Sequence, residues 1–429
     1  MSQAIPAINA PPAPNRPASP HAGVPYGDRV AFVVELAKRL HNYGTTAQRL
    51  EGAIGAVARR LGLRCHPWSN PTGLILSFSD AATASPLHDT TQVIRLEPGG
   101  VDLNKLCAAD AIAEDVMAGR SDLRHGAAAL HALDVPLGRP WLALETLCFG
   151  LLSASVAGLL RNSWADIISA GLIGLMVGAL QWASIGRPRM QEAGEAIAAF
   201  VATLLAAAIA TFLIPLTTKT VVIAAIIVLM PGLSLTNAVS ELSSQHLVSG
   251  MARFGGALAT LIKLTFGTVA AMQLVRVLGW RPHEAVEHRV GAWVEWAALL
   301  VSAYTFAVLF RAARRDYLLV IASAVFGYLV TRWVGSRLGN DAGVFFGSMA
   351  ISAASNVYAR WARRPGALVR VPGIVLLVPG SVSFRSLTFV LERDLMLGLN
   401  TAVAVLSVLV ALVAGVLFGN LLVSARRNL

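Results

Sequence analysis

Charged residues are scarce in this sequence, and no two of its cysteines are closely spaced. Only 14% of the 429 residues are charged, whereas 55% are hydrophobic and the mean hydropathy is +0.62. This composition excludes an ordinary soluble globular protein and predicts a membrane protein. Cys65, Cys107 and Cys148 are far apart and show no CxxC spacing, so neither a disulfide framework nor a thiolate metal site is predicted.

Nucleotide-binding and hydrolase motifs are also missing. The sequence contains no Walker, GxSxG or GxGxxG element. HEAVEH, at 283–288, resembles a zinc-binding helix, but Glu at both 284 and 287 breaks the HExxH and HxxEH patterns. We therefore predict no cofactor, no metal site and no catalytic residues, and we expect that the chain is not an enzyme.

The net charge of +11 is concentrated in the apolar part of the chain. Residues 26–135 hold 11 Lys and Arg against 12 Asp and Glu, whereas residues 136–429 hold 23 against 12. Cations in short loops between hydrophobic runs report membrane topology, so we predict no nucleic-acid partner. Alternate loops carry these arginines, which places both termini in the cytoplasm; the arginines lie at 187–189, 311–315, 360–370 and 426–427.

The region before residue 136 differs from the rest. Residues 1–25 are rich in Pro and Ala and lack the pattern of a signal peptide, so a disordered tail is predicted. Residues 26–135 predict a small soluble α+β domain on the cytoplasmic side. Amphipathic stripes indicate helices over 28–44, 45–63, 102–119 and 122–134, and alternating patterns indicate two strands over 74–80 and 91–98.

From about residue 140 the chain is a series of apolar runs near 20 residues long, which is the length needed to cross a bilayer as a helix. We predict a polytopic α-helical membrane protein with about ten transmembrane helices. They fall into a first five-helix half, 136–280, and a second, 281–429. The runs centre near residues 150, 173, 204, 227, 264, 301, 324, 351, 376 and 410.

An internal repeat links the two halves. VLMPGLSLTNAVSELSSQHLVSG (228–250) aligns with LLVPGSVSFRSLTFVLERDLMLG (376–398) at a constant offset of 148 residues. Each copy lies in the fourth run of a five-run half, and an odd number of spans per half inverts one half relative to the other. Two inverted five-helix repeats are typical of secondary transporters.

The repeated Pro-Gly pairs predict a substrate site. Pro removes a backbone donor and Gly permits unusual torsions, so each helix should break and expose backbone groups that bind substrate. A Pro-Gly pair that merely ends a helix at the interface is the alternative, which the duplication makes less favourable. The predicted site residues are Pro231, Gly232, Ser234, Thr236, Asn237, Pro379, Gly380 and Ser381.

Ionisable residues inside apolar runs are candidates for coupling because burying them is costly. Asp166 and Asp341 are predicted to carry protons, although each could equally cap the start of a helix. Lys263 lies in the middle of a run and is predicted to be a buried charge that could snorkel or pair with a carboxylate of another helix. Arg49 and Glu51 are expected to make surface pairs.

Five stretches carry a family resemblance: GTTAQRLEGAIGAVARRLGL, TQVIRLEPGGVDLNKL, NSWADIISAGLIGLMVGAL, MPGLSLTNAVSELSSQHLVSGMAR and VPGIVLLVPGSVSF. Together they resemble the threonine/serine exporter family of bacterial inner-membrane proteins. The resemblance implies export of L-threonine and L-serine, driven by protons, from a chain embedded in the lipid bilayer; a homo-oligomer is left open. Where relatives often carry a Gly-x-Glu pattern, this chain has Gly44-Thr45-Thr46.

Three other functions compete with this prediction. Some relatives in the resembled family are associated with other small metabolites such as dicarboxylates. A membrane-embedded enzyme, with the soluble domain as its catalytic module, would need a nucleophile or metal set, which the sequence lacks. A passive channel gives no reason for inverted repeats with paired broken helices, whereas alternating access does.

Overall fold

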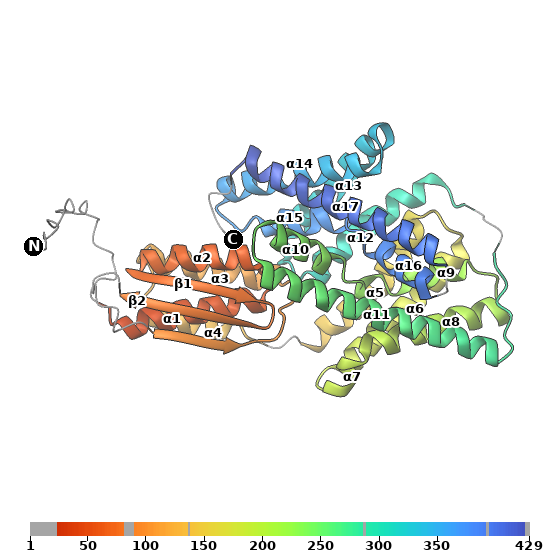
Figure 1. The fold of residues 1–429 in the computed structure, drawn as a ribbon, viewed down its shortest axis with the longest axis horizontal. Coiled ribbons are helices and arrows are strands. Elements are labelled where there is room, and N and C mark those ends of the chain that lie inside the picture. The colour runs from red at the N-terminus through yellow and green to blue at the C-terminus, as the bar shows by residue number, and fades with distance from the viewer. Residues whose placement is uncertain (1–23, 81–89, 136–137, 286–288, 392–393, 425–429) are drawn as a thin grey trace, which may run out of the picture.

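The computed structural model describes residues 24–80, 90–135, 138–285, 289–391 and 394–424 (Figure 1). Within these ranges, an α+β domain lies at one end and a larger body of helices makes up the rest. Several sequence features fall outside the described residues, namely most of the predicted tail at 1–25, residues 286–288 of HEAVEH, and Arg426 and Arg427.

The N-terminal domain packs helices against a three-stranded antiparallel sheet of order β1-β2-β3. Its core contains the fully buried side chains of Phe32, Leu36, Ile54 and Phe78, which come from the first two helices and the central strand. The elements are α1 (Tyr26–Asn42), α2 (Ala47–Arg60), β1 (Leu63–Asn70), β2 (Gly73–Asp80), β3 (Thr90–Arg95), α3 (Leu103–Met117) and α4 (Leu123–Ala132).

One strand, β1, is not among the two that the sequence predicts. It pairs with β2 over its whole length, from Leu63 opposite Asp80 to Asn70 opposite Gly73. Pro67 lies in the middle of β1, and proline is tolerated there because β1 is an edge strand whose outer side needs no donor. The proline and the polar residues around it hide the strand in the sequence.

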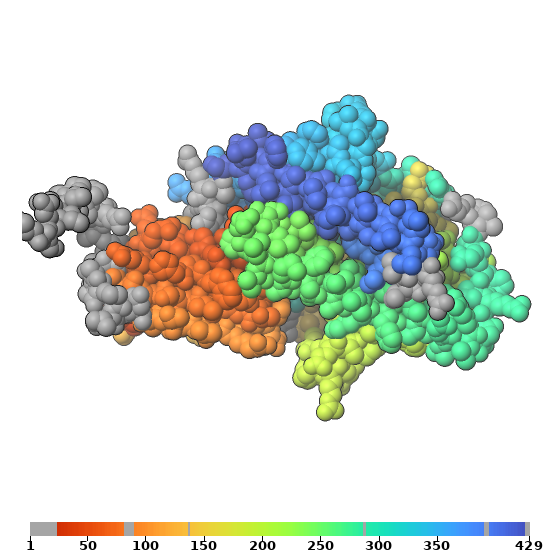
Figure 2. Space-filling model, in the orientation of Figure 1, coloured from red at the N-terminus to blue at the C-terminus, as the bar shows by residue number. Residues whose placement is uncertain are grey.

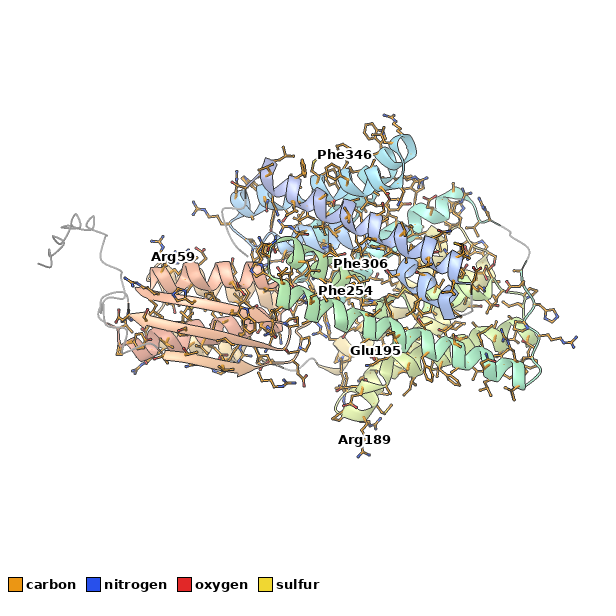
Figure 3. The ribbon with its side chains drawn as sticks, in the orientation of Figure 1. Arg59, Arg189, Glu195, Phe254, Phe306 and Phe346 are labelled. Atoms are coloured by element: carbon orange, nitrogen blue, oxygen red, sulfur yellow. The ribbon has the colours of Figure 1, made fainter. Side chains whose placement is uncertain are left out.

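The helical body follows, and it has the polytopic α-helical character that the sequence predicts. α7 projects from this body and carries Arg189 outward into the surroundings (Figure 3). The elements are α5 (Arg139–Leu159), α6 (Trp164–Ser184), α7 (Pro188–Glu192), α8 (Gly194–Phe212), α9 (Thr218–Ala225), the 3-10 helix η2 (Ile227–Leu229), α10 (Gly232–Ser243), α11 (Leu247–Val277), α12 (Ala292–Leu309), the 3-10 helix η3 (Arg314–Asp316), α13 (Tyr317–Leu338), α14 (Asn340–Ala362), α15 (Ala367–Val375), α16 (Gly380–Leu391) and α17 (Leu395–Leu422).

Among the described residues, eight helical segments are long and apolar enough to cross a membrane, and nine if a bent pair is counted as one span. The bent pair joins Thr218–Ala225 to Ile227–Ser243 at an angle of 54°. Ten spans are expected from the sequence, and the run near residue 351 accounts for the difference because α14 is less apolar than the others. The chain is thus a multi-pass membrane protein with eight to nine candidate spans.

Buried polar side chains explain the lower hydropathy of α14. Ser348, Ser352 and Asn356 are almost fully buried, because α14 packs between α13 and α17. Ser352 and Asn356 both donate hydrogen bonds to the side-chain oxygen of Asn420 on α17, at 3.2 and 2.9 Å. These side chains are satisfied within the protein, so α14 can lie inside a bundle without being uniformly apolar.

Helix packing follows the same pattern in the two halves. In the first half α5 packs on α6 and α9, and α8 packs on α11; in the second half α12 packs on α13 and α15, and α14 packs on α17. Between the halves, α10 packs on α17 and α16 packs on α11. These contacts join helices at similar places in the chain order of the two halves.

The N-terminal domain attaches to the helical body at several places, and Figure 2 shows its surface directly against α10 and α11. At the start of α3, the backbone N–H groups of Leu103 and Asn104 donate to the carbonyls of Phe310 and Arg311, at 2.9 and 3.1 Å. These two carbonyls belong to the C-terminal end of α12, so unpaired groups at two helix ends satisfy each other.

Candidate functional site

The two Pro-Gly breaks lie against each other. α10 begins at Gly232 and α16 begins at Gly380, each directly after its proline. A β-carbon on Gly232 would lie 3.4 Å from the α-carbon of Gly380, and one on Gly380 would lie 3.5 Å from the α-carbon of Gly232. The predicted helix breaks are both present, and at Gly232 the space is tight, because a β-carbon there would also lie 2.5 Å from Cγ1 of Val378.

A cavity of about 760 Å³, here called the central cavity, opens beside the two breaks. Its wall is mostly apolar, with Phe149, Leu152 and Phe306 among the lining side chains. Its size and its few polar groups are typical of a small-molecule site. The polar side chains that line it are Glu145, Asn162, Thr220, Ser234, Arg311, Ser381 and Arg385.

The central cavity holds charges of both signs. Glu145 on α5 pairs with Arg311 at the end of α12, with 3.4 Å between Oε1 and the guanidinium nitrogen. Arg385 on α16 is exposed. The first turns of α10 and α16 also line the cavity, and α10 has no side-chain cap, so the positive ends of two helix dipoles point to the same space.

Thr236 and Asn237 do not lie with the other predicted site residues. They line a second cavity of about 220 Å³, here called the junction cavity, which is formed between the N-terminal domain and the helical body. Gln48 and Arg49 of α2 line it from one side, and Arg370 of α15 lines it from another. The predicted substrate residues are therefore divided: Pro231, Gly232, Ser234, Gly380 and Ser381 line the central cavity, Thr236 and Asn237 line the junction cavity, and Pro379 lines neither.

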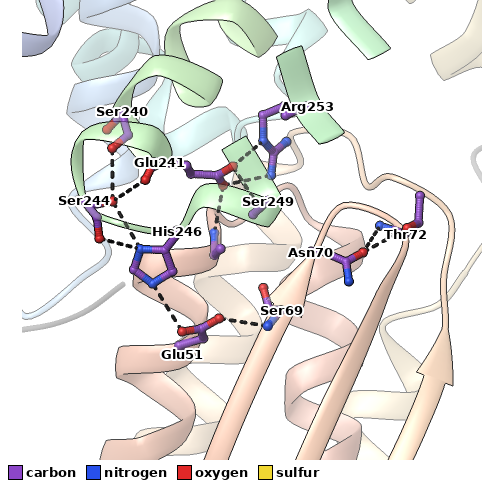
Figure 4. Close-up of polar contacts among 11 residues, drawn as sticks. Glu51, Ser69, Asn70, Thr72, Ser240, Glu241, Ser244, His246, Ser249 and Arg253 are labelled. Atoms are coloured by element: carbon purple, nitrogen blue, oxygen red, sulfur yellow. Dashed lines mark hydrogen bonds and ion pairs between the residues drawn. The ribbon is translucent and has the colours of Figure 1, made fainter. Parts of the chain in front are cut away.

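A buried carboxylate, Glu241, fastens α10 and α11 to the N-terminal domain (Figure 4). Its side chain is 1% exposed and accepts hydrogen bonds from the hydroxyl of Ser249 and the guanidinium of Arg253, at 2.8 and 3.1 Å. It also accepts from the N–H of Ala47 in the first turn of α2, at 3.0 Å. We call these four residues the Glu241 cluster. A carboxylate at a helix N-terminus satisfies a free donor and interacts favourably with the dipole.

A second contact lies next to the Glu241 cluster (Figure 4). Glu51 of α2 accepts from the N–H of Ser69 at 2.8 Å, and its other oxygen lies 3.2 Å from Nε2 of His246 before α11. Burial raises the pKa of Glu51, and these two partners oppose that shift. Arg49 and Glu51 are each expected to make pairs at the protein surface, but Glu51 pairs with His246 and Arg49 lines the junction cavity, so both side chains lie against the helical body.

Two family profiles match the chain. The family described as "Putative threonine/serine exporter" matches residues 31–275, and that described as "Threonine/Serine exporter, ThrE" matches residues 295–422. The first match alone covers more than half of the sequence. The chain belongs to the threonine/serine exporter family.

Curated relatives of this exporter-family chain are fungal membrane proteins. An uncharacterized protein of Schizosaccharomyces pombe is 24% identical over 83% of the chain and 48% of its own length. The pheromone-regulated membrane protein 10 of Saccharomyces cerevisiae is 25% identical over 83% of the chain and 47% of its own length, and that of Yarrowia lipolytica is 25% identical over 83% and 30%. The chain thus spans about half or less of these relatives. No solved structure matches.

Asp166 of this exporter-family chain occupies the first turn of α6. Ser163, the N-cap residue, accepts from the Asp166 N–H at 3.1 Å and donates its hydroxyl to the Asp166 carboxylate at 2.9 Å. The N–H and hydroxyl of Thr217 also donate to this carboxylate, at 2.8 and 3.1 Å. Asp166 is 1% exposed and so joins the start of α6 to the start of α9.

The other two predicted charges lie near the protein surface. Asp341 is exposed in the first turn of α14 and accepts from the Ser407 hydroxyl of α17 at 2.6 Å. Lys263 pairs with Glu195 of α8, with 3.5 Å between Nζ and Oε2, and 42% of its side chain is accessible. Lys263 thus makes a pair with a carboxylate of another helix, one of the arrangements that the sequence offers.

Glu241 is the functional candidate that sequence reasoning missed. It lies within the repeated segment 228–250, and a carboxylate in an apolar run is a candidate by default. Its two charged and hydroxyl partners, Ser249 and Arg253, follow within 12 residues, on the next helix. The sequence spacing does not reveal that Glu241 contacts Ser249 and Arg253, because these residues come together only where the chain turns between α10 and α11.

Proposed function

We propose that this member of the threonine/serine exporter family is a secondary active exporter of L-threonine and L-serine, driven by the proton gradient. The central cavity is its substrate site. The observation that carries the proposal is the contact between Gly232 and Gly380, which brings the first turns of two broken helices to one cavity. Broken helices that meet at a repeat interface are typical of secondary transporters.

The charges around the central cavity fit a zwitterionic amino acid. The N-terminal ends of α10 and α16, together with Arg385, attract the substrate carboxylate. Glu145 pairs with the ammonium group of the substrate, which takes the place of Arg311. Ser234 and Ser381 offer partners to the side-chain hydroxyl that threonine and serine share.

Matching helix packing supports an inverted repeat. α10 packs on α17 while its counterpart α16 packs on α11, the reciprocity expected of a pseudo-two-fold axis in the membrane plane. α14 completes ten crossings in this proposal. It returns the chain to the side where α13 begins, because Arg364, just after α14, pairs through two hydrogen bonds with Asp316, just before α13.

The proposed orientation places both termini and the N-terminal domain in the cytoplasm of a bacterial inner membrane. Arg311, Arg364 and Arg370 lie on the side of the helical body that contacts this domain. Arginines concentrated on one side favour that side as the cytoplasmic one. Asp166 and Asp341 are the proposed proton carriers.

Counterflow in proteoliposomes tests the substrate. Vesicles loaded with unlabelled L-threonine should accumulate labelled L-threonine and L-serine, and succinate should not compete. Glu145→Gln and Arg385→Gln should each reduce counterflow at least ten-fold, while Arg189→Gln on the projecting α7 should leave it unchanged. Counterflow of succinate without threonine would instead identify a dicarboxylate exporter, and equal activity in all variants would remove the central cavity from the site.

A further inference from the structure

The junction cavity carries unbalanced positive charge. Arg49 and Arg370 line it, and no Asp or Glu is among the described residues of its wall. The remaining polar lining consists of hydroxyl and amide side chains from both the N-terminal domain and the helical body. A cavity of about 220 Å³ with two cations and neutral hydrogen-bonding groups is suited to a small anion.

Arg49 is the first of the two cations that line the junction cavity. Within the described residues its guanidinium makes no hydrogen bond or ion pair, in contrast to Arg39 and Arg253 nearby. Burial lowers the pKa of Arg49 to about 10, so the side chain still carries its charge at neutral pH. Arg49 is partly buried, and a partly buried cation without an anionic partner is stabilised when a ligand supplies the anion.

Arg370 is the second cation of the junction cavity. It donates hydrogen bonds to the side-chain oxygens of Asn356 and Asn420, at 2.8 and 3.2 Å. Both partners are neutral amides, so they orient the guanidinium without cancelling its charge. The Nε of Arg370 is buried and has no partner among the described atoms.

Two threonines belong to the wall of the junction cavity, one from the N-terminal domain and one from the helical body. Thr45 precedes α2, Thr236 belongs to α10, and both line the junction cavity. Their Oγ1 atoms are inaccessible and have no hydrogen-bond partner in the described structure. Both residues belong to the cavity wall, but their Oγ1 atoms are shielded from it, so the side chains would have to rotate before these hydroxyls could reach a ligand.

We propose that the junction cavity binds the carboxylate of a small cytosolic organic acid. The carboxylate lies between Arg49 and Arg370, whose guanidinium groups donate to its oxygens. Arginine suits this role because its planar fork matches the two carboxylate oxygens. The ligand is either the exported amino acid itself or a separate organic acid, and both present the same carboxylate.

Such a ligand ties the N-terminal domain to the helical body. It contacts α2 on one side and α10 and α15 on the other, next to the break at Gly232. Val101 and Leu233 line both cavities, so the junction cavity is separated from the central one by these two side chains. Occupancy of the junction cavity is therefore positioned to influence the central cavity.

Thermal unfolding of the purified full-length protein tests this inference without any transport measurement. Succinate, malonate and L-threonine should be added separately at rising concentration, with L-threonine amide and chloride as probes that lack a carboxylate. At least one carboxylate should raise the melting temperature, and the amide and chloride should not. An effect of L-threonine alone identifies the exported amino acid as the ligand, whereas an effect of succinate or malonate identifies a separate organic acid.

Arg49→Gln should weaken this ligand at least ten-fold, whereas Arg59→Gln, an exposed arginine on the same helix, should not (Figure 3). Arg49→Lys keeps the charge without the fork and should bind at an intermediate strength. Without ligand, Arg49→Gln should unfold no earlier than the wild type, because it removes an unpaired charge; this separates loss of binding from misfolding.

Arg385→Gln, in the central cavity, distinguishes the two sites. If the inference holds, this variant keeps the stabilisation that depends on Arg49, even if transport fails. The inference is overturned if no carboxylate stabilises the wild type, if Arg49→Gln binds as tightly as the wild type, or if Arg385→Gln alone abolishes the effect.

Discussion

Gly232 and Gly380 face each other across the two halves of the helical body, but the space around them is unequal. A β-carbon on Gly232 would lie 2.5 Å from Cγ1 of Val378, which is closer than side chains tolerate. A β-carbon on Gly380 would lie 3.4 Å from Cβ of Met230, which is close to ordinary contact. The same substitution should therefore have different effects at the two positions.

Gly232→Ala should destabilise the protein by about 2 kcal/mol through overpacking, and Gly380→Ala by less than about 1 kcal/mol. Melting temperatures and threonine counterflow measure both effects. The double variant Gly232→Ala/Val378→Ala should recover most of the loss, since it removes the clashing methyl group. Equal losses at the two glycines, or no recovery in the double variant, would contradict the geometry.

The Glu241 cluster predicts a strong effect of a conservative change. Glu241→Gln should cost about 3 kcal/mol, because it leaves Arg253 without its buried anion and weakens the bond to Ala47. Thermal unfolding measures the change, and Glu192→Gln at the exposed end of α7 is the matched control. Adding Arg253→Gln should cost less than the sum of the single changes; strict additivity would show that the two side chains do not interact.

His41 predicts an acid-sensitive N-terminal domain. Burial lowers the pKa of His41 below its ordinary value of 6.5, and the nearby charge of Arg253 lowers it further. The folded state then favours the neutral imidazole, so this contribution to stability is present above pH 6.5 and is lost as the pH falls toward the lowered pKa. Melting temperatures between pH 8 and pH 5 should fall less in His41→Gln than in the wild type. The exposed His125→Gln should follow the wild type; the same slope in all three proteins would exclude His41 as the cause.

Asp166 lies in the first turn of α6, three residues after the N-cap residue Ser163, and Asp166→Asn is a sharp test of proton coupling. The amide of Asn can keep contacts with Ser163 and Thr217, so the melting temperature should change little. If Asp166 carries the proton, uphill threonine export stops in this variant while threonine exchange continues. Uphill export at the wild-type rate would leave Asp166 with a structural role only.

The hydrophobic pattern predicts most of the fold because long apolar runs admit one structure in a membrane. It predicts the four helices of the N-terminal domain, since each carries an amphipathic stripe. It misses β1, where Pro67 interrupts the pattern, and it overstates the apolar character of α14, whose buried Ser352 and Asn356 pair with another helix. These errors share one cause: a partner distant in sequence satisfies a group that looks unfavourable locally.

The sequence predicts a feature of the site only where residues within one segment are enough to determine that feature. The two breaks can be placed from the sequence because their Pro-Gly pairs are repeated at a constant offset, whereas Pro372 and Gly373 lie inside α15 without ending it. Which cavity Ser234 and Thr236 each reach depends on the position of the N-terminal domain, and no local pattern encodes that position. The roles of Arg49 and Glu241 depend on the same docking.

The N-terminal domain is attached to both halves at once. α2 is bonded to Glu241 in the first half, and α3 is bonded to the carbonyls of Phe310 and Arg311 in the second. If the two halves move apart in the proposed transport cycle, the domain cannot follow both of them, so each change of access would have to release one attachment and form it again. In that cycle the breaking of these bonds would limit the turnover rate.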